Sequence, residues 1–333
     1  MFPYMISGEH CCRISAIMAV YNPDPSFFSK AVDSILCQSH PVFELLLVND
    51  GGSESFRELL PDDPRIRVIS KKNEGVAATR NVAITHARGD YIALLDQDDY
   101  WYPDKLHEQI AMIPEPGAAC MVISPVDIVD ENGNMTTSKK TLKIATAYND
   151  KTHTKDFLLN LAEGNYIFSS TPLIHRRVFD CVGLFDPYTQ PHDDWDMYLR
   201  VAFAGIPVYC YQGRSLSVWR IHDFNESHKV QAMLRSKCRV EKKLLLHVHD
   251  RDLKQVLYLN LLIDAIGRDS LLYKKGRYRF YRMLIRQHLP KLVQAKIQSS
   301  KKVSSLMRQT HRIRKTVVKA SRRYVVSFFY WLK

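Results

Sequence analysis

Three carboxylates, Asp96, Asp98 and Asp99, stand directly after an apolar segment in the stretch ALLDQDDYW. Carboxylates this close repel one another unless a cation lies between them. Mg²⁺ or Mn²⁺ bound to a nucleotide typically takes one or two protein carboxylates and completes its shell with phosphate oxygens. The pattern therefore favours a divalent cation shared with a phosphate group. The alternative is a solvated turn in which an Asp caps the helix expected near Pro103.

Other polar side chains follow the neighbouring apolar segments. Tyr21 could stack on a base, Asp50 could accept a hydrogen bond from a base N–H, and Arg80 could neutralise a diphosphate. Taken singly, each also has an ordinary structural explanation: the edge of a core, a turn, and a solvated helix residue. The sequence contains neither G-x-x-x-x-G-K-[ST] nor a G-x-G-x-x-G after the first strand, which argues against kinases, ATPases and dinucleotide enzymes.

The elements that would position these residues alternate between buried strands and helices. Near-continuous apolar runs separated by helical spacing are typical of a parallel sheet covered on both faces. Ligands of such sheets gather at the carboxyl ends of the strands. We expect strands over residues 14–22, 43–50, 65–70 and 90–96, and helices over residues 23–39, 75–87 and 102–113.

The alternation weakens beyond the fourth strand. The segment 119–135 predicts a strand that enters a hairpin at Asn132-Gly133, and strand signals almost vanish beyond about Asn225. We therefore expect one domain over residues 1–225 and a helical region over residues 226–333. Between these segments the pattern predicts helices over residues 156–164, 176–183 and 192–205 and a strand over residues 207–211.

Several motifs follow one another along roughly residues 13–228: ISAIMAVYN, FELLLVNDGGS, NEGVAATRN, GDYIALLDQDDYW, LIHRRVFDCVGLFD, HDDWDMYLRVAFAG and WRIHDFNES. In this order they resemble glycosyltransferase family 2. The resemblance implies the GT-A fold, a Rossmann-like α/β architecture with a mostly parallel central sheet and helices on both faces. It also implies an inverting glycosyltransferase that depends on a nucleotide sugar.

The resemblance assigns roles at the strand ends. It implies that Asp50 holds uracil, that Asp96 and Asp98 form the D-x-D pair, and that Asp98 or Asp99 meets the metal and the ribose. The chemistry agrees with these roles, because departure of a nucleoside diphosphate develops negative charge on its β-phosphate. A bound Mg²⁺ or Mn²⁺ ion and Arg80 would stabilise that charge.

Two further residues receive roles from the same resemblance. Asp194 would be the catalytic base that takes the proton of the acceptor hydroxyl, although a helix N-cap would explain it as well. His222, in WRIHDFNES, resembles the family's R-x-H element and would approach the metal or the diphosphate. Three positions depart from the family pattern: Asn49 and Asp193 replace a common Asp and a frequent Glu, and Gly52 stands where Ser is usual.

The charge of the chain is unevenly distributed. The 333 residues carry a net charge of +12, yet residues 270–333 hold 18 Lys or Arg and no Asp or Glu, and the remainder holds 29 basic against 35 acidic residues. Within residues 312–333 an apolar stripe that includes Phe328 and Trp331 lies opposite basic residues, which is typical of a helix in a membrane interface. The alternatives are packing on the catalytic domain and, last, nucleic-acid binding, because these aromatic residues suit lipid better than phosphate.

Composition sets the expected compartment. No run approaches the ~18 apolar residues of a membrane span, and the first residues lack the pattern of a signal peptide, so we expect a cytosolic chain. Seven cysteines without a C-x-x-C pair indicate reduced, mostly buried thiols.

These observations together predict a metal-dependent glycosyltransferase, peripheral on the cytoplasmic face of a membrane. It would move one sugar from a nucleotide sugar, by first choice a UDP-sugar, to a glycan or lipid-linked acceptor in surface polysaccharide biosynthesis, with no nucleic acid as partner. One alternative is a sugar-phosphate nucleotidyltransferase, which should have a Gly- and Arg-rich loop after the first strand. The other is a non-catalytic protein that binds nucleotide sugars or membranes.

Overall fold

The computed structural model describes residues 12–136, 155–248, 254 and 257. The chain divides into two compact units, residues 1–228 and residues 229–333. In the described part of the second unit lies helix α8 (Val230–His247). The basic segment 270–333 with its amphipathic stripe lies outside the described residues. No described helix combines the length and the hydropathy needed to cross a bilayer.

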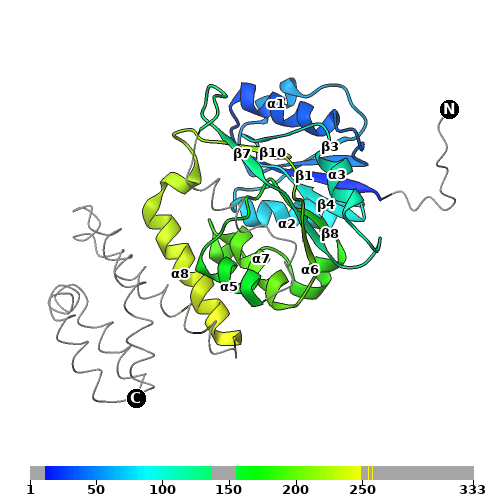
Figure 1. The fold of residues 1–333 in the computed structure, drawn as a ribbon. Coiled ribbons are helices and arrows are strands. Elements are labelled where there is room, and N and C mark those ends of the chain that lie inside the picture. The colour runs from blue at the N-terminus through cyan, green and yellow to red at the C-terminus, as the bar shows by residue number, and fades with distance from the viewer. Residues whose placement is uncertain (1–11, 137–154, 249–253, 255–256, 258–333) are drawn as a thin grey trace, which may run out of the picture. The chain divides into compact units, whose positions relative to one another are not determined.

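A seven-stranded sheet, in the order β3-β2-β1-β4-β8-β6-β9, forms the centre of the first unit (Figure 1). Strands β3, β2, β1 and β4 are parallel, with Ile17 of β1 aligned with Leu46 of β2 and Leu94 of β4. Nearly every residue of β1, β2 and β4 is buried, which explains the unbroken apolar runs in the sequence. The strands are β1 (Ile14–Val20), β2 (Glu44–Asn49), β3 (Ile66–Ser70), β4 (Tyr91–Leu94), β6 (Met121–Ile123), β8 (Leu173–His175) and β9 (Val208–Cys210).

In the other half of the sheet, β6 and β9 confirm the strands predicted within residues 119–135 and 207–211, whereas β8 was not predicted from the sequence. Strand β8 lies between β4 and β6 and runs antiparallel to both, and β9 pairs parallel with β6. The alternation of side chains cannot reveal a strand of three residues such as Leu173–His175. The sheet is therefore mixed, with its parallel part at the end that carries the first four strands.

A second sheet of three strands brings a remote segment beside the carboxylates. Strand β5 (Tyr100–Trp101) directly follows Asp99, and β10 (Ser217–Arg220) pairs antiparallel with it and parallel with β7 (Val126–Val129). The hairpin turn predicted at Asn132-Gly133 is confirmed by a bridge between Val129 and Met135 after β7. This small sheet places the residues after Arg220 next to the turn that follows β4.

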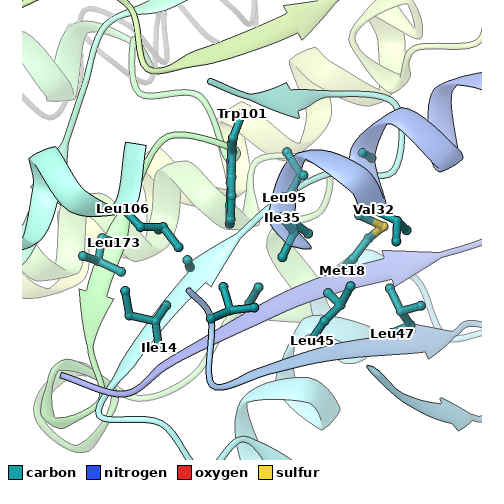
Figure 2. Close-up of a cluster of buried hydrophobic side chains, with 14 of the residues drawn as sticks. Ile14, Met18, Val32, Ile35, Leu45, Leu47, Leu95, Trp101, Leu106 and Leu173 are labelled. Atoms are coloured by element: carbon teal, nitrogen blue, oxygen red, sulfur yellow. The ribbon is translucent and has the colours of Figure 1, made fainter. Parts of the chain in front are cut away.

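Helices cover both faces of the large sheet. Helix α1 begins after Asp24, whose carboxylate accepts the N–H groups of Ser26 and Phe27, and its buried side chains pack on one face of β1 and β2. Helix α2 packs on the opposite face (Figure 1). Figure 2 shows the core beneath α1, where Met18, Val32 and Ile35 lie together. The helices of this unit are α1 (Pro25–Leu36), α2 (Val76–His86), α3 (Lys105–Ala111), α5 (Lys155–Glu163), α6 (Arg177–Val182) and α7 (Asp193–Phe203), with 3₁₀ turns at Glu54–Leu59, Pro187–Thr189 and Glu226–His228.

The described cysteines are free thiols. Cys120, Cys210 and Cys238 are buried, whereas Cys37 and Cys181 are exposed. The expectation of reduced thiols agrees with this arrangement, and burial applies to half of the six described cysteines.

Candidate active site

The three carboxylates that follow β4 lie on a turn and point to different partners. Strand β4 ends at Leu94, and the N–H of Asp99 donates to the carbonyl of Asp96 at 3.2 Å. A strand continuing to Asp96 was expected from the sequence, with Asp96 and Asp98 on one side of it as the D-x-D pair. In the turn, each carboxylate instead has its own set of contacts.

Asp96 is paired with a buried arginine. Its Oδ1 accepts from Nη2 of Arg80 at 2.6 Å, and its Oδ2 accepts from the hydroxyl of Ser169. Nη1 of Arg80 donates to Asp193 at 3.0 Å, so one guanidinium joins the end of β4 to the start of α7. Burial lowers the pKa of Arg80, but the charges of Asp96 and Asp193 outweigh this effect and raise it. Because the Arg80 side chain is 7% exposed and both of its ends are used, it offers little surface to a diphosphate.

Asp98 meets a histidine that is remote in sequence. Nε2 of His222 lies 2.8 Å from Oδ2 of Asp98, and their side chains are 13% and 25% exposed. Asn225 orients this contact, because its Oδ1 accepts the N–H of His222 at 2.6 Å while its amide donates to Asp98 at 3.4 Å. The two candidate metal ligands from the sequence are therefore side by side, at a position that solvent reaches.

Asp98 and His222 fit a divalent cation that is shared with a substrate. The described residues contain no group of three or more His, Cys, Asp or Glu side chains that could enclose a metal ion. The pair supplies one oxygen ligand and one nitrogen ligand, so most of an octahedral shell would come from phosphate oxygens and water. A nucleotide-bound Mg²⁺ or Mn²⁺ has this kind of shell.

Asp99 is buried and has a structural role. Its Oδ2 accepts from the hydroxyl of Ser170 at 2.5 Å and its Oδ1 accepts the N–H of Arg220 at 3.0 Å. Burial, with the charges of Asp98 and Asp96, raises the pKa of Asp99 well above its ordinary value. At 1% exposed, Asp99 is out of reach of a ribose, and we assign it to holding β10 beside the turn.

Asp50 shapes a loop at the end of β2. Its carboxylate accepts from Nζ of Lys71 at 2.7 Å and from the N–H groups of Glu74 and Gly75 at 2.9 and 2.8 Å. Burial would raise the pKa of Asp50, but the Lys71 hydrogen bond and these amides outweigh it and lower the pKa. The carboxylate is therefore ionised and holds the loop between β3 and α2 in place, where only part of its acceptor capacity remains for a base.

Tyr21 projects from the end of β1. Its side chain is 49% exposed, and its backbone is held by the carboxamide of Gln97. Beside it, a Cβ on Gly52 would lie 2.8 Å from Oδ1 and 2.9 Å from the backbone nitrogen of Asn22. The departure from the family at Gly52 thus has a local reason, because the loop after β1 leaves no room for a side chain.

Asp194 lies in the first turn of α7. Its Oδ2 accepts from the amide of Asn165 at 2.9 Å and its Oδ1 accepts the N–H of Trp195 at 2.6 Å. Burial is the largest cause that raises the pKa of Asp194, to about 7, and the charge of Asp193 adds to it while Arg80 opposes it. The N-cap of α7 is His192 and Asp194 lies inside the helix, so the capping alternative is wrong. A pKa near neutrality is typical of a general base.

The structure thus brings the candidate residues together in two groups. Arg80 joins Asp96 to the start of α7, where Asp194 lies, and Asp98 contacts His222 on the other side of the same turn. The residues that orient these groups were not predicted from the sequence, because hydrogen-bonding Ser, Asn and Gln side chains have no periodic signal. They are Gln97, Asn165, Ser169, Ser170 and Asn225.

Known glycosyltransferases resemble this chain in sequence. An uncharacterized glycosyltransferase of Rickettsia felis is 42% identical over 109 residues, which are 32% of this chain and 18% of that protein. A putative teichuronic acid biosynthesis glycosyltransferase of Bacillus subtilis, TuaG, is 37% identical over 111 residues, 32% of this chain and 44% of that protein. The chain therefore spans less than half the length of either relative.

Solved structures show the same fold. S. aureus TarS 1-349, in complex with UDP-GlcNAc, aligns with a TM-score of 0.55 at 15% identity, over 80% of this chain and 75% of that one. The alignment identifies the mixed α/β architecture as the GT-A fold. The profile of the family described as Glycosyl transferase family 2 matches residues 15–183, about half of the chain. The chain belongs to glycosyl transferase family 2, as the motifs predicted.

Proposed function

We propose that the protein transfers a sugar from a UDP-sugar to an acceptor hydroxyl with inversion at the anomeric carbon. The observation that carries this proposal is the link through Arg80, which joins Asp96, in the turn of the candidate cation site, to Asp193, next to Asp194. The candidate cation ligands Asp98 and His222 and a carboxylate with a pKa of about 7 thus lie near one edge of the sheet, which supports the proposal. This edge is where parallel strands end and where ligands of such sheets bind.

The donor site would lie along the ends of β1, β2 and β4. Tyr21 and the loop held by Asp50 would contact the base, and Asp98 with His222 would hold Mg²⁺ or Mn²⁺. The cation, when bound, would stabilise the charge on the departing diphosphate. That TarS forms complexes with UDP-GlcNAc and with UDP supports a uridine nucleotide as donor.

Asp194 would act as the general base. Its carboxylate accepts the proton of the acceptor hydroxyl while that oxygen forms a bond to the anomeric carbon and the bond from that carbon to the diphosphate breaks. Attack from the side opposite to the leaving group inverts the configuration. Asn165 holds the carboxylate by a hydrogen bond at 2.9 Å, so the base is already oriented before the acceptor binds.

The acceptor would be a glycan or a lipid-linked oligosaccharide of surface polysaccharide assembly. The similarity to a protein named for teichuronic acid biosynthesis supports this setting. The 18 uncompensated cations of residues 270–333 support peripheral attachment to anionic lipid on the cytoplasmic face.

Calorimetry with UDP, with and without Mn²⁺, tests this function. Wild-type protein should bind UDP more tightly with Mn²⁺, and Asp98→Ala should lose this dependence and its turnover, because the cation loses its carboxylate. The exposed Asp180 provides a matched control, and Asp180→Ala should behave as wild type. A screen of hydrolysis of UDP-, GDP- and dTDP-sugars would then identify the donor. Absence of UDP binding by the wild-type protein would refute the proposal, as would an Asp98→Ala variant with full activity.

A further inference from the structure

Gln97, the middle residue of the D-Q-D sequence, contacts the loop after β1 with both ends of its carboxamide. Its Oε1 accepts the N–H of Tyr21 at 2.9 Å, and its Nε2 donates to the carbonyl of Tyr21 at 3.1 Å. The two residues are 76 positions apart. One side chain thus satisfies both backbone groups of a residue that follows the last strand position of β1, Val20.

The loop that carries Tyr21 needs such support. Asn22 has a φ of 41°, a left-handed conformation that costs a residue with a side chain on the order of 1 kcal/mol. Its Oδ1 accepts the N–H of Ser53 at 2.9 Å, and Gly52 allows the close approach. The loop is therefore held by specific contacts on both sides, and Gln97 provides those on the side of the cation site.

We propose that Gln97 is a positioning residue that holds the Tyr21 ring at the nucleoside end of the donor site. The proposal rests on the proposed function, in which Tyr21 contacts the base. Gln97 stands between Asp96 and Asp98, so a single turn presents the cation ligand and fixes the nucleoside loop. With both backbone groups of Tyr21 bonded, the backbone that carries the ring keeps its place before a ligand binds, which lowers the ordering cost of binding.

Calorimetric titration with uridine, which lacks phosphates, isolates this role from the cation site. Each of the two hydrogen bonds contributes modestly, so we expect Gln97→Ala to weaken uridine binding about tenfold. Gln97→Met keeps the length of the side chain without its hydrogen bonds and should weaken binding equally. Gln212→Ala, at an exposed glutamine whose amide donates to Cys210, is the matched control and should bind as wild type.

A double-mutant cycle shows whether Gln97 acts through Tyr21. In a Tyr21→Ala background the ring is absent, so Gln97→Ala should cost no more than about twofold in uridine affinity. The gain in UDP affinity from Mn²⁺ should stay within about twofold of wild type in Gln97→Ala, because the Asp98 and His222 contact does not involve Gln97.

The outcomes separate this proposal from the function on which it rests. Additive losses in the cycle, or an unchanged uridine affinity in Gln97→Ala, would overturn the positioning role. If both Gln97→Ala and Gln97→Met lose the native thermal transition, Gln97 is a folding residue and the proposal is equally wrong. If Tyr21→Ala leaves uridine affinity unchanged, or wild type does not bind uridine or UDP, the proposed donor site itself fails.

Discussion

Replacing Asp194 by Asn should remove catalysis and alter how stability depends on pH. With an ordinary pKa of 3.8 and a folded-state pKa of about 7, the folded protein keeps a proton that the unfolded chain releases. Stability therefore falls as pH rises between about 4 and 7 and is level above that range. From pH 5 to pH 7 the loss is at most about 2.7 kcal/mol, at about 1.4 kcal/mol per pH unit.

Two effects reduce this upper limit. The Asp194 side chain is partly exposed, which screens its charge, and an Asn amide would face one of the two donors, Asn165 or the Trp195 N–H. Between pH 5 and pH 8 the fall in the free energy of unfolding should therefore be about 1–2 kcal/mol smaller in Asp194→Asn than in wild type. At roughly 2 °C per kcal/mol for a chain of this size, the difference in Tm between variant and wild type should shift by about 2–4 °C.

Thermal unfolding at pH 5, 6, 7 and 8 and donor turnover at the same pH values measure both effects. Wild-type kcat should rise through pH 7 as the base ionises, and the variant should lose roughly 10²–10⁴ in kcat while its UDP affinity stays within a few-fold. Asp180→Asn, at an exposed carboxylate, is the control. Turnover at the wild-type rate in Asp194→Asn would refute the role of Asp194 as base, and Tm curves that run parallel with pH would refute the raised pKa of its carboxyl group.

Three further outcomes are expected. Gly52→Ala should weaken UDP binding about tenfold with little change in Tm, since the new Cβ meets Asn22; unchanged affinity measured by calorimetry would show that the loop can shift. Lys105→Met should raise the free energy of unfolding by about 1–3 kcal/mol at pH 7. The ammonium group of Lys105 is fully buried and donates to Gln109, and among the described residues no carboxylate lies within ion-pair distance of it. A lower Tm in the variant would contradict this prediction. Full-length protein should sediment with anionic liposomes, and less of it should sediment as added salt shortens the Debye length from ~10 to ~3 Å. A chain ending near Gln309 should lose liposome binding but keep UDP binding. If this shortened chain still sediments, the membrane role of the final segment is refuted.

The first four strands and the main helices could be predicted because burial leaves a regular pattern. Strand β2, Glu44–Asn49, is buried throughout, and α1 buries Phe28, Val32 and Ile35 at helical spacing. Strands β8 and β10 could not be predicted in this way. They have three and four residues, and their partners lie far away in sequence, so their position depends on tertiary pairing alone.

The candidate site was also predicted only in part from the sequence. Residue types and motif order predict Asp98, His222 and Asp194 as candidates, but they do not predict the contacts that these residues make. The turn after Leu94 sends Asp96 to Arg80 and buries Asp99. The different surroundings of these carboxylates result from hydrogen bonds to residues remote in sequence, which no local sequence pattern predicts.

The antiparallel strand β8 has a consequence for any shortened form of this protein. It fills the place next to β4, and it also carries the hydrogen bonds that connect β6 and β9 to the rest of the sheet. A fragment that ends before Leu173 would leave the ladder of β4 open as a bare, apolar edge, which is a template for self-association. Minimal versions of the protein should therefore extend at least through β9 and β10.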